Sequence, residues 1–428
     1  MASFIVRISA IAIALFFSIL PVTSQALTVD EAITLARENV PFYRAAGYRV
    51  KSSEELYKAT LGPYLPALDA STQQQRHMTT AQEFNTWLYD ITASYTLFDG
   101  GRRRANRDIS RLTLDSDREV LRTNLLDLEF NVKNAFYTVI AQKETLDQRK
   151  KQLQDTQKDY EVAEGRYKFG VAKLSDLLQA SVRLEQARFN VVQAEGNLNK
   201  AFSDLNSLLG KSLEERYDLQ GSLDIEFVPP GREALFMVAM ERPEIKQAEN
   251  SLKISEKTTL LNLSTFFPVL SVNATYQSTS GGLAGLATGG GVINEEWILG
   301  FNATWNIFEL GKFYQYRSSV IEQSVSTELL SDIKRTVKLN VDRAYEDFTT
   351  SVNQLKVAQQ QLTQAQQNYE QAYGEYKVGK GDILSLVQAE SQLSTAREQL
   401  VASRLSVILF KSQLERVVGV TTIGSVPR

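Results

Sequence analysis

The tetrapeptide Tyr167-Lys168-Phe169-Gly170 recurs 209 residues later as Tyr376-Lys377-Val378-Gly379. Upstream of both copies, apolar residues follow an alternating spacing of three and four, and they keep the same phase under the same shift. This spacing is typical of the buried face of a long α-helix that packs against other helices. We therefore interpret the chain as one helical hairpin present in two copies, which pack through the same face.

The segments that lead into these tetrapeptides are too long for the helices of an ordinary globular domain. Residues 101–168 and 311–377 contain no proline, and each has one internal glycine close to its end. As helices they would each span roughly 100 Å, at about 1.5 Å per residue. After the glycine turns, shorter return helices are predicted over about 175–209 and 382–418, and these would cover half of each long helix.

Two further helices are expected, and each has about the length that the return helix lacks. Residues 27–61 begin with Thr28 and Glu31 in the spacing of a capping box, and residues 233–264 form the equivalent segment of the second half. We expect these helices to stack end to end with the return helices, beside each long one. Alanine is frequent on the apolar seams, which favours close helix approach and a hollow wall one layer thick.

Between the short and the long helices the periodicity changes to two residues, which is typical of β-strands. The pattern predicts two hairpins, at about 67–98 and 269–308. In each strand one face is apolar and carries aromatic residues near its ends, while the other face is polar. The aromatic residues of the apolar face are Trp87, Tyr89, Tyr95, Tyr276, Trp297, Phe301 and Trp305.

These strands indicate an outer-membrane barrel whose apolar face contacts lipid and whose polar face lines a water-filled lumen. Four strands cannot close a barrel, and lipid does not tolerate open strand edges. Several copies of the chain, each contributing four strands, would resolve this conflict. The predicted fold class is therefore mostly α with a four-stranded antiparallel β contribution, assembled into an α-barrel and a transmembrane β-barrel. One alternative is a soluble periplasmic coiled-coil adaptor or scaffold, although such a protein has no need of aromatic alternating strands.

The N-terminus, residues 1–26, is predicted to be a secretory signal peptide. Arg7 precedes an apolar run from Ile8 to Leu20, which is too short to span a bilayer as a helix, since that takes roughly 20 residues. Ser24-Gln25-Ala26 follows as a small-x-small cleavage pattern. The chain has no cysteine, so neither a disulfide nor a thioether lipid anchor is expected. Its formal net charge of −3 comes with no basic patch that would bind nucleic acid.

The sequence contains no recognisable catalytic or metal-binding constellation. His77 is the only histidine, and without cysteine there is no ligand set for a transition metal. Residues 98–102 have two glycines but lack the Lys-Ser/Thr of a phosphate-binding loop, so we interpret them as a strand-to-helix turn with Asp99 as the helix N-cap. The glycine-rich segment from Gly281 to Gly291 is interpreted as an extracellular loop. We predict neither enzymatic activity nor a cofactor, and an enzyme on a helical scaffold is the least supported alternative.

In the order of its motifs, the mature chain resembles the TolC family of outer-membrane efflux proteins along nearly its whole length. No single motif is specific to the family. The order of the motifs, which occurs in both halves of the chain, is specific to it. The motifs are Leu27-Thr28-Val29-Asp30-Glu31-Ala32, Tyr64-Leu65-Pro66, the stretch from Tyr95 to Arg102 with its weaker echo from Trp305 to Lys312, and the two tips ending at Gly170 and Gly379.

The resemblance implies a homotrimer, with a twelve-stranded barrel in the outer membrane of a Gram-negative bacterium and a twelve-helix tube through the periplasm. It implies a passive exit duct, docked at its tip to a periplasmic adaptor (membrane fusion) protein and driven by an inner-membrane pump of the ABC, RND or MFS class. Both drugs or other small molecules and type I secreted proteins fit as cargo. Residues 27–218 and 233–428 would be the two repeats, with 219–232 as an equatorial linker.

The resemblance also points to the start of the second return helix as part of a gate. In the family, acidic residues there often narrow the closed pore, but Ser385 and Gln388 stand at the corresponding positions of this chain. We hypothesise that Asp382 and Asp176 supply the charge near the closed aperture, while Ser385 and Gln388 line it as neutral groups. Alternatively, Asp382 only caps its helix.

Two further roles are expected at the tips, about 169–174 and 378–382. The side chains expected to tether neighbouring helices and keep the tip shut are Tyr167, Tyr376, Lys377 and Lys380, although the tyrosines fit a plain seam role equally well. The residues expected to contact the adaptor, because they are the most distant from the membrane, are Phe169, Gly170, Val171, Val378 and Gly379.

Overall fold

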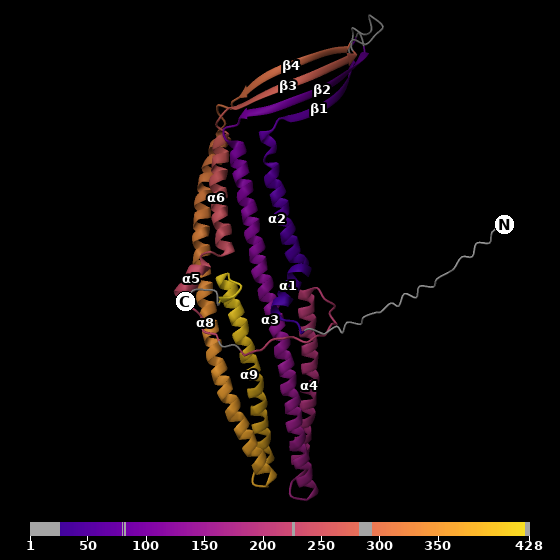
Figure 1. The fold of residues 1–428 in the computed structure, drawn as a ribbon, viewed down its shortest axis with the longest axis vertical. Coiled ribbons are helices and arrows are strands. Elements are labelled where there is room, and N and C mark those ends of the chain that lie inside the picture. The colour runs from indigo at the N-terminus through magenta and orange to yellow at the C-terminus, as the bar shows by residue number, and fades with distance from the viewer. Residues whose placement is uncertain (1–25, 79, 81–82, 225–226, 282–292, 424–428) are drawn as a thin grey trace, which may run out of the picture.

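The computed structural model describes residues 26–78, 80, 83–224, 227–281 and 293–423. The chain forms a narrow, elongated body with a four-stranded sheet at one end and two helical tips at the other (Figure 1). The predicted signal peptide and the predicted extracellular loop lie outside the described residues, apart from Ala26 and Gly281. No helix among the described residues is both long and apolar enough to cross a membrane.

Two very long helices form the frame of the helical part, α3 (Arg102–Lys168) and α8 (Leu310–Lys377). Each turns at a tip and returns as a helix of 36 residues, α4 (Leu174–Leu209) after α3 and α9 (Ile383–Val418) after α8. These bounds agree with the sequence prediction to within one residue, which is the precision that helix ends allow.

The half of each long helix nearer the sheet is covered by a shorter helix, as expected. α2 (Pro41–Ala59) lies beside α3, and α6 (Pro243–Ser264) packs against both α3 and α8 (Figure 1). Nearer the tips, α4 packs beside α3, while α9 contacts both α8 and α3. The two halves of the chain are therefore joined by α6 nearer the sheet and by α9 nearer the tips.

The first predicted helix, residues 27–61, is interrupted, so the prediction of one continuous helix was wrong. It consists of α1 (Val29–Asn39) and α2, because Val40 has an extended backbone before Pro41. Proline has no N–H group with which to continue a helix, and it disfavours helical geometry in the preceding residue. The capping box at Thr28 is present as predicted.

The second predicted helix, residues 233–264, is interrupted in the same way. Its first part is α5 (Arg232–Ala239), and the extended Arg242 separates it from α6, which begins at Pro243. Proline suits the first position of α2 and of α6, because the N–H that it lacks would have no partner inside the helix. Each half of the chain therefore has two shorter helices, not one, ahead of its first strand.

The strands form one antiparallel sheet in the order β1-β2-β3-β4. β1 (Ala67–Met78) and β2 (Glu83–Phe98) form the first hairpin, and β3 (Val269–Gly281) and β4 (Ile293–Thr304) form the second. Pairing of β2 with β3 joins the hairpins, which leaves β1 and β4 as open edges. The second hairpin is shorter than predicted, since β4 ends before residue 308.

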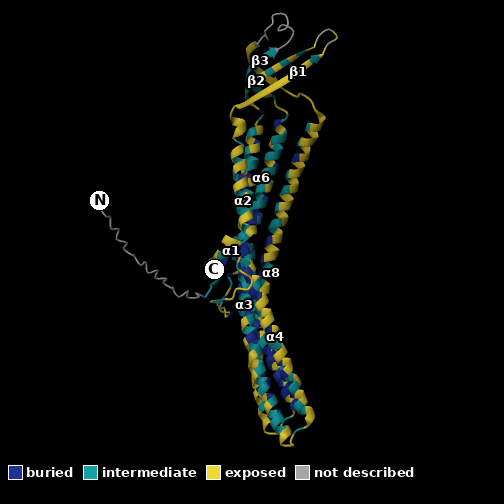
Figure 2. Ribbon diagram, turned by 90° about the vertical axis from the view of Figure 1, so that its right-hand side faces the viewer, coloured by how far each residue is buried: buried dark blue, intermediate teal, exposed yellow. Residues whose placement is uncertain are grey.

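The packed interior has an apolar cluster in each half of the chain at mid-height and a third cluster near the tips, to which both halves contribute. Val132 and Val341 stand at corresponding positions, and both are almost completely buried. Nearer the sheet, burial is sparse: Ser53 is the only buried residue of α2, and Ser319 is the only one of α8 before Val337 (Figure 2). The part of the helical layer next to the sheet is thus left largely uncovered within one chain.

Candidate functional site

Both helical hairpins end in tight turns whose geometry depends on glycine. Gly170 and Gly379 have left-handed backbones, with φ of 73° and 83°, a conformation that glycine adopts without strain. The turns leave Phe169, Val171 and Val378 exposed by 86%, 64% and 68%. The structure thus places the predicted adaptor-contact residues at the end of the molecule farthest from the sheet (Figure 1).

The four predicted tethers differ from one another in their surroundings. Tyr376 is buried, and the Arg166 guanidinium lies 4.4 Å from its ring centroid and donates a hydrogen bond to its backbone carbonyl. Tyr167 is exposed, and Lys377 and Lys380 are exposed with no side-chain partner among the described residues. Arg166, which sequence reasoning missed, joins the two tips. One sequence feature could have pointed to Arg166: the two repeats differ here, because an acidic residue stands at the corresponding position of the second half.

A buried polar contact lies about two helical turns from the tip. The Tyr369 hydroxyl on α8 donates a hydrogen bond to Asp159 Oδ1 on α3 at 3.0 Å. Burial raises the pKa of Asp159 to about 7, although the hydrogen bond from Tyr369 opposes this shift. Burial also raises the pKa of Glu390 on α9, which accepts a hydrogen bond from the Gln152 amide at 2.8 Å. Asp159 and Glu390 are both buried, and neither was among the residues that the sequence singled out.

Ion pairs join α3 to α9 from mid-height toward the tip, and we call this series the inter-hairpin ladder. Its pairs are Asp127–Arg416, Lys133–Glu415, Glu144–Arg404, Arg149–Glu398 and Asp155–Arg397. Apart from the Arg149 pair, their nitrogen–oxygen distances are 2.6 to 2.9 Å. Because every pair links the first helical hairpin to the second, the ladder holds the two hairpins together.

The predicted gate residues lie at the start of the two return helices. Asp382 is the N-cap of α9, and its carboxylate accepts the backbone N–H of Ser385 at 2.7 Å. That hydrogen bond is the main cause of its lowered pKa. Ser385 and Gln388 are both exposed on α9, whereas Asp176 is half-buried in the first turn of α4. The structure therefore shows the capping role of Asp382 and gathers three of the four predicted residues on one helix.

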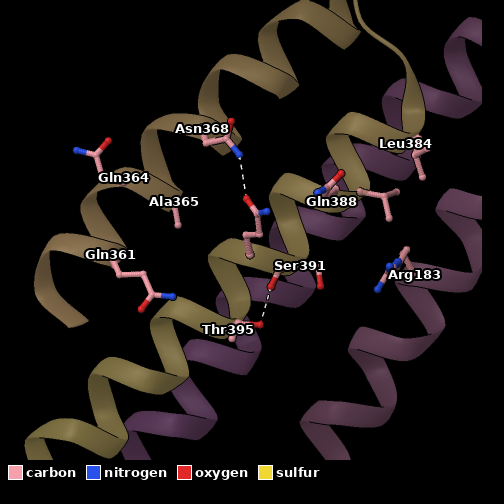
Figure 3. Close-up of a pocket in the computed structure, with 11 residues that line it drawn as sticks. Arg183, Gln361, Gln364, Ala365, Asn368, Leu384, Gln388, Ser391 and Thr395 are labelled. Carbon is pink, nitrogen blue, oxygen red and sulfur yellow. Dashed lines mark hydrogen bonds between the residues drawn. The ribbon is translucent and has the colours of Figure 1, made fainter. Parts of the chain in front are cut away.

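An open groove of about 810 Å³ runs between α8 and α9 beside Gln388 (Figure 3). Most of its lining is polar and uncharged: Gln361, Gln364, Asn368, Gln388, Ser391, Gln392 and Thr395. The Asn368 amide donates a hydrogen bond across the groove to Gln392 at 3.2 Å, and Arg183 reaches in from α4. The groove offers amide and hydroxyl groups to a polar partner.

The strand register brings most of the predicted aromatic residues onto one face of the sheet. Those that share this face are Trp87, Tyr89, Tyr95, Tyr276, Trp297 and Phe301. Trp305 was predicted to belong with them, but it follows the end of β4, and its indole N–H donates to the Phe266 carbonyl at 3.0 Å. The other face is polar, with the hydroxyls of Thr92 and Thr275 hydrogen-bonded across β2 and β3 at 2.9 Å.

The turn from β2 into α3 confirms the predicted role of its glycines but not the predicted N-cap. Gly101 is the N-cap, and Asp99 lies two residues earlier, accepting the N–H groups of Gly101 at 3.1 Å and Arg103 at 2.9 Å. Gly100 has a φ of 68°, and a Cβ there would lie 2.7 Å from the Ser264 carbonyl oxygen. The turn therefore holds the start of α3 against the end of α6.

Comparison with known proteins identifies the same architecture elsewhere. The family model described as outer membrane efflux protein matches residues 32–211 and 237–420. The probable efflux pump outer membrane protein TtgC of Pseudomonas putida is 25% identical over 408 residues, which cover 92% of this chain and 81% of TtgC. Among solved structures, the outer membrane protein VceC of Vibrio cholerae matches with a TM-score of 0.80 at 15% identity, covering 91% of this chain and 96% of VceC. The CmeC outer membrane channel of Campylobacter jejuni matches with a TM-score of 0.78 at 17% identity, covering 91% and 85%.

Proposed function

Because this chain belongs to the outer membrane efflux protein family, whose model matches both of its halves, we propose that it is the exit duct of a tripartite export system. In this role it performs no chemistry and offers a water-filled path from the periplasm to the exterior. An inner-membrane pump of the ABC, RND or MFS class supplies the energy, and a periplasmic adaptor links pump and duct. The cargo is either a small molecule, such as a drug, or a type I secreted protein.

The observation that carries this proposal is a sheet with two open edges and one aromatic, apolar face, mounted on helices of roughly 100 Å. In lipid every backbone polar group needs a partner, so the edges must pair with other copies of the chain. Three copies would close a twelve-stranded barrel whose aromatic face contacts lipid. A soluble adaptor or scaffold has no use for such a face, which is why we do not favour that alternative.

Exposed apolar residues on the helices also support a ring of three copies. Along one edge of the layer, α4 exposes Val182 by 69% and Val192 by 68%. Along the other edge, α8 exposes Ile321 by 62% and Val357 by 63%. Two different apolar edges of one chain can pair head to tail, and such pairing gives a closed ring when the rotation fits. We propose that residues 27–218 and 233–428 are duplicated halves of this wall.

Membrane fractionation and planar-bilayer recording test the proposed function together. We expect the full-length protein to appear in outer-membrane fractions, to be purified in detergent with the mass of three chains, and to give discrete conductance steps. A monomer in the periplasmic fraction that produces no steps would contradict the proposal and would favour the soluble scaffold.

We further propose that the turns at Phe169-Gly170-Val171 and Val378-Gly379 are the adaptor contact, since they are exposed and lie farthest from the sheet. The chain contains no cysteine, so single cysteines give crosslinks without background. V171C and K380C variants are expected to crosslink to a co-expressed adaptor, whereas a cysteine placed at mid-height should not. Absence of crosslinks at both tip positions would count against docking there.

We propose that Asp382 and Asp176 supply negative charge near the closed aperture, while Ser385 and Gln388 line it as neutral groups. Asparagine caps helices as well as aspartate does, so Asp382→Asn removes the charge and keeps the cap. We expect this variant to show weaker block by multivalent cations in bilayer recordings, with unchanged thermal stability. Asp382→Ala loses the cap as well and should lower the thermal stability. Unchanged block in D382N would leave Asp382 with its capping role alone.

The buried Asp159 predicts that closure of the tip depends on pH. An exposed aspartate loses its proton near pH 4, but Asp159 in the packing of this structure, which we propose to be the closed tip, keeps it up to about pH 7. The closed packing is therefore favoured at low pH and loses stability as pH rises between these values. Opening in bilayers should increase from pH 5 to pH 8. Asp159→Asn keeps an acceptor for Tyr369 and should weaken this dependence, leaving the part due to Glu390, whose pKa is also raised. An unaltered pH profile would show that Asp159 is not responsible.

A further inference from the structure

The strand register brings carboxylates on the polar face of the sheet to nearly the same height. Asp90 on β2 lies opposite Gln277 on β3, and Gln277 lies opposite Glu296 on β4. Asp69 on β1 lies opposite Thr92, one step along the same face toward the helices, which is a separation of about 7 Å along the strand. These three acidic side chains therefore form one band across all four strands, which we call the carboxylate band.

Among the described strand residues, no lysine or arginine lies on the same face as this band. Arg76 is the only lysine or arginine in the four described strands. The register places Arg76 on the opposite, aromatic face, where it pairs with Glu83 at 2.7 Å. Within the band, the Ser71 hydroxyl, an uncharged group, donates a hydrogen bond to Asp90 at 2.8 Å.

We propose that the carboxylate band of Asp69, Asp90 and Glu296 makes the sheet end of the duct selective for cations, independently of the helical tip. This inference rests on the proposed function, because a ring of three chains would bring three copies of the band around one lumen. Rings of aspartate and glutamate select cations by raising their local concentration and repelling anions. The selectivity is expected to weaken in concentrated salt, because the Debye length falls from about 10 Å at 0.1 M to about 3 Å at 1 M.

The test is the reversal potential of channels in planar bilayers under a gradient of KCl. The variant D69N/D90N/E296Q is expected to lose at least half of the wild-type preference for K⁺ over Cl⁻, and the single variants D90N and E296Q should show partial losses. Glu295→Gln is the matched control, since Glu295 is the chain neighbour of Glu296 but lies on the aromatic face. It should keep the wild-type preference.

Two outcomes separate this inference from the proposed function. If the wild-type protein and the triple variant form channels with the same preference for K⁺, the proposal for the carboxylate band is overturned while the duct function stands. If the wild-type protein forms no channel at all, the proposed function fails first. The single variants guard against poor assembly of the triple variant, because each changes one solvent-facing carboxyl group into its amide.

Discussion

Reversing two arginines of the inter-hairpin ladder, Arg149→Glu with Arg397→Glu, should open the tip and raise single-channel conductance several-fold. Arg149 pairs with Glu398, and Arg397 pairs with Asp155 at 2.9 Å. Both substitutions would set acid against acid between α3 and α9. Because these pairs are only partly buried, we expect each reversal to destabilise the contact between α3 and α9 by about 1–3 kcal/mol, which is less than the 3–5 kcal/mol of a fully buried pair. About 2.7 kcal/mol is a hundredfold shift between closed and open states.

Arg188→Glu is the matched control for this experiment. Arg188 pairs with Glu185 at 2.7 Å within α4, and both side chains are more than half exposed. Its reversal changes the net charge of the tip region by the same amount per site without touching the contact between hairpins. Conductance should stay at the wild-type value in this control. A ladder double variant that also conducts like the wild type would show that the ladder does not hold the tip closed.

Replacing Gly100 by valine should prevent assembly of the channel. The backbone of Gly100 is left-handed, and an added Cβ would lie 2.7 Å from the Ser264 carbonyl oxygen and 2.8 Å from the Phe267 Cβ. Backbone strain adds about 1–3 kcal/mol and crowding about another 1–3 kcal/mol. The junction of sheet and helices would then move, and the strand edges would no longer meet those of neighbouring copies. Loss of the heat-resistant oligomer on a denaturing gel would report this.

Gly101→Ala separates strain from crowding at the same junction. Gly101 is also left-handed, with a φ of 90°, but a Cβ there would have no atom within 4 Å. Its substitution should cost only the strain, about 1–3 kcal/mol, and the oligomer should still form. Normal oligomer yield from Gly100→Val would contradict the close packing of α3 against α6 at this turn.

Local features of this fold could be predicted from the sequence because they repeat at short range. The long helices follow from an apolar seam with no proline, and the turns follow from Gly170 and Gly379. Polar and apolar alternation was enough to place β1, β2 and β3. The break at Pro41 was predictable in principle, but the seam continues across it, and the proline effect won over the periodicity.

The contacts between the hairpins could not be predicted, because ion pairs between distant segments have no periodic signature. Arg397 and Asp155 are 242 residues apart in the chain, and in the sequence both resemble residues of a solvated helix face. The burial of Asp159 could not be predicted either, since it depends on the contact between α8 and α3 at Tyr369. The capping role of Asp382 was weighed beforehand because it depends only on a residue three positions away.

The open strands at both borders of the sheet have a consequence for biogenesis. Backbone amides and carbonyls of β1 and β4 that face outward have no strand partner among the described residues, and in the proposed ring they would pair only when a neighbouring copy arrives. If the proposed ring forms, membrane insertion of a lone subunit is unfavourable, and the last step of maturation depends on subunit concentration. Cells that synthesise little of the protein would hold it mainly as a periplasmic precursor exposed to proteases and chaperones. The abundance of finished ducts should then rise more steeply than the rate of synthesis.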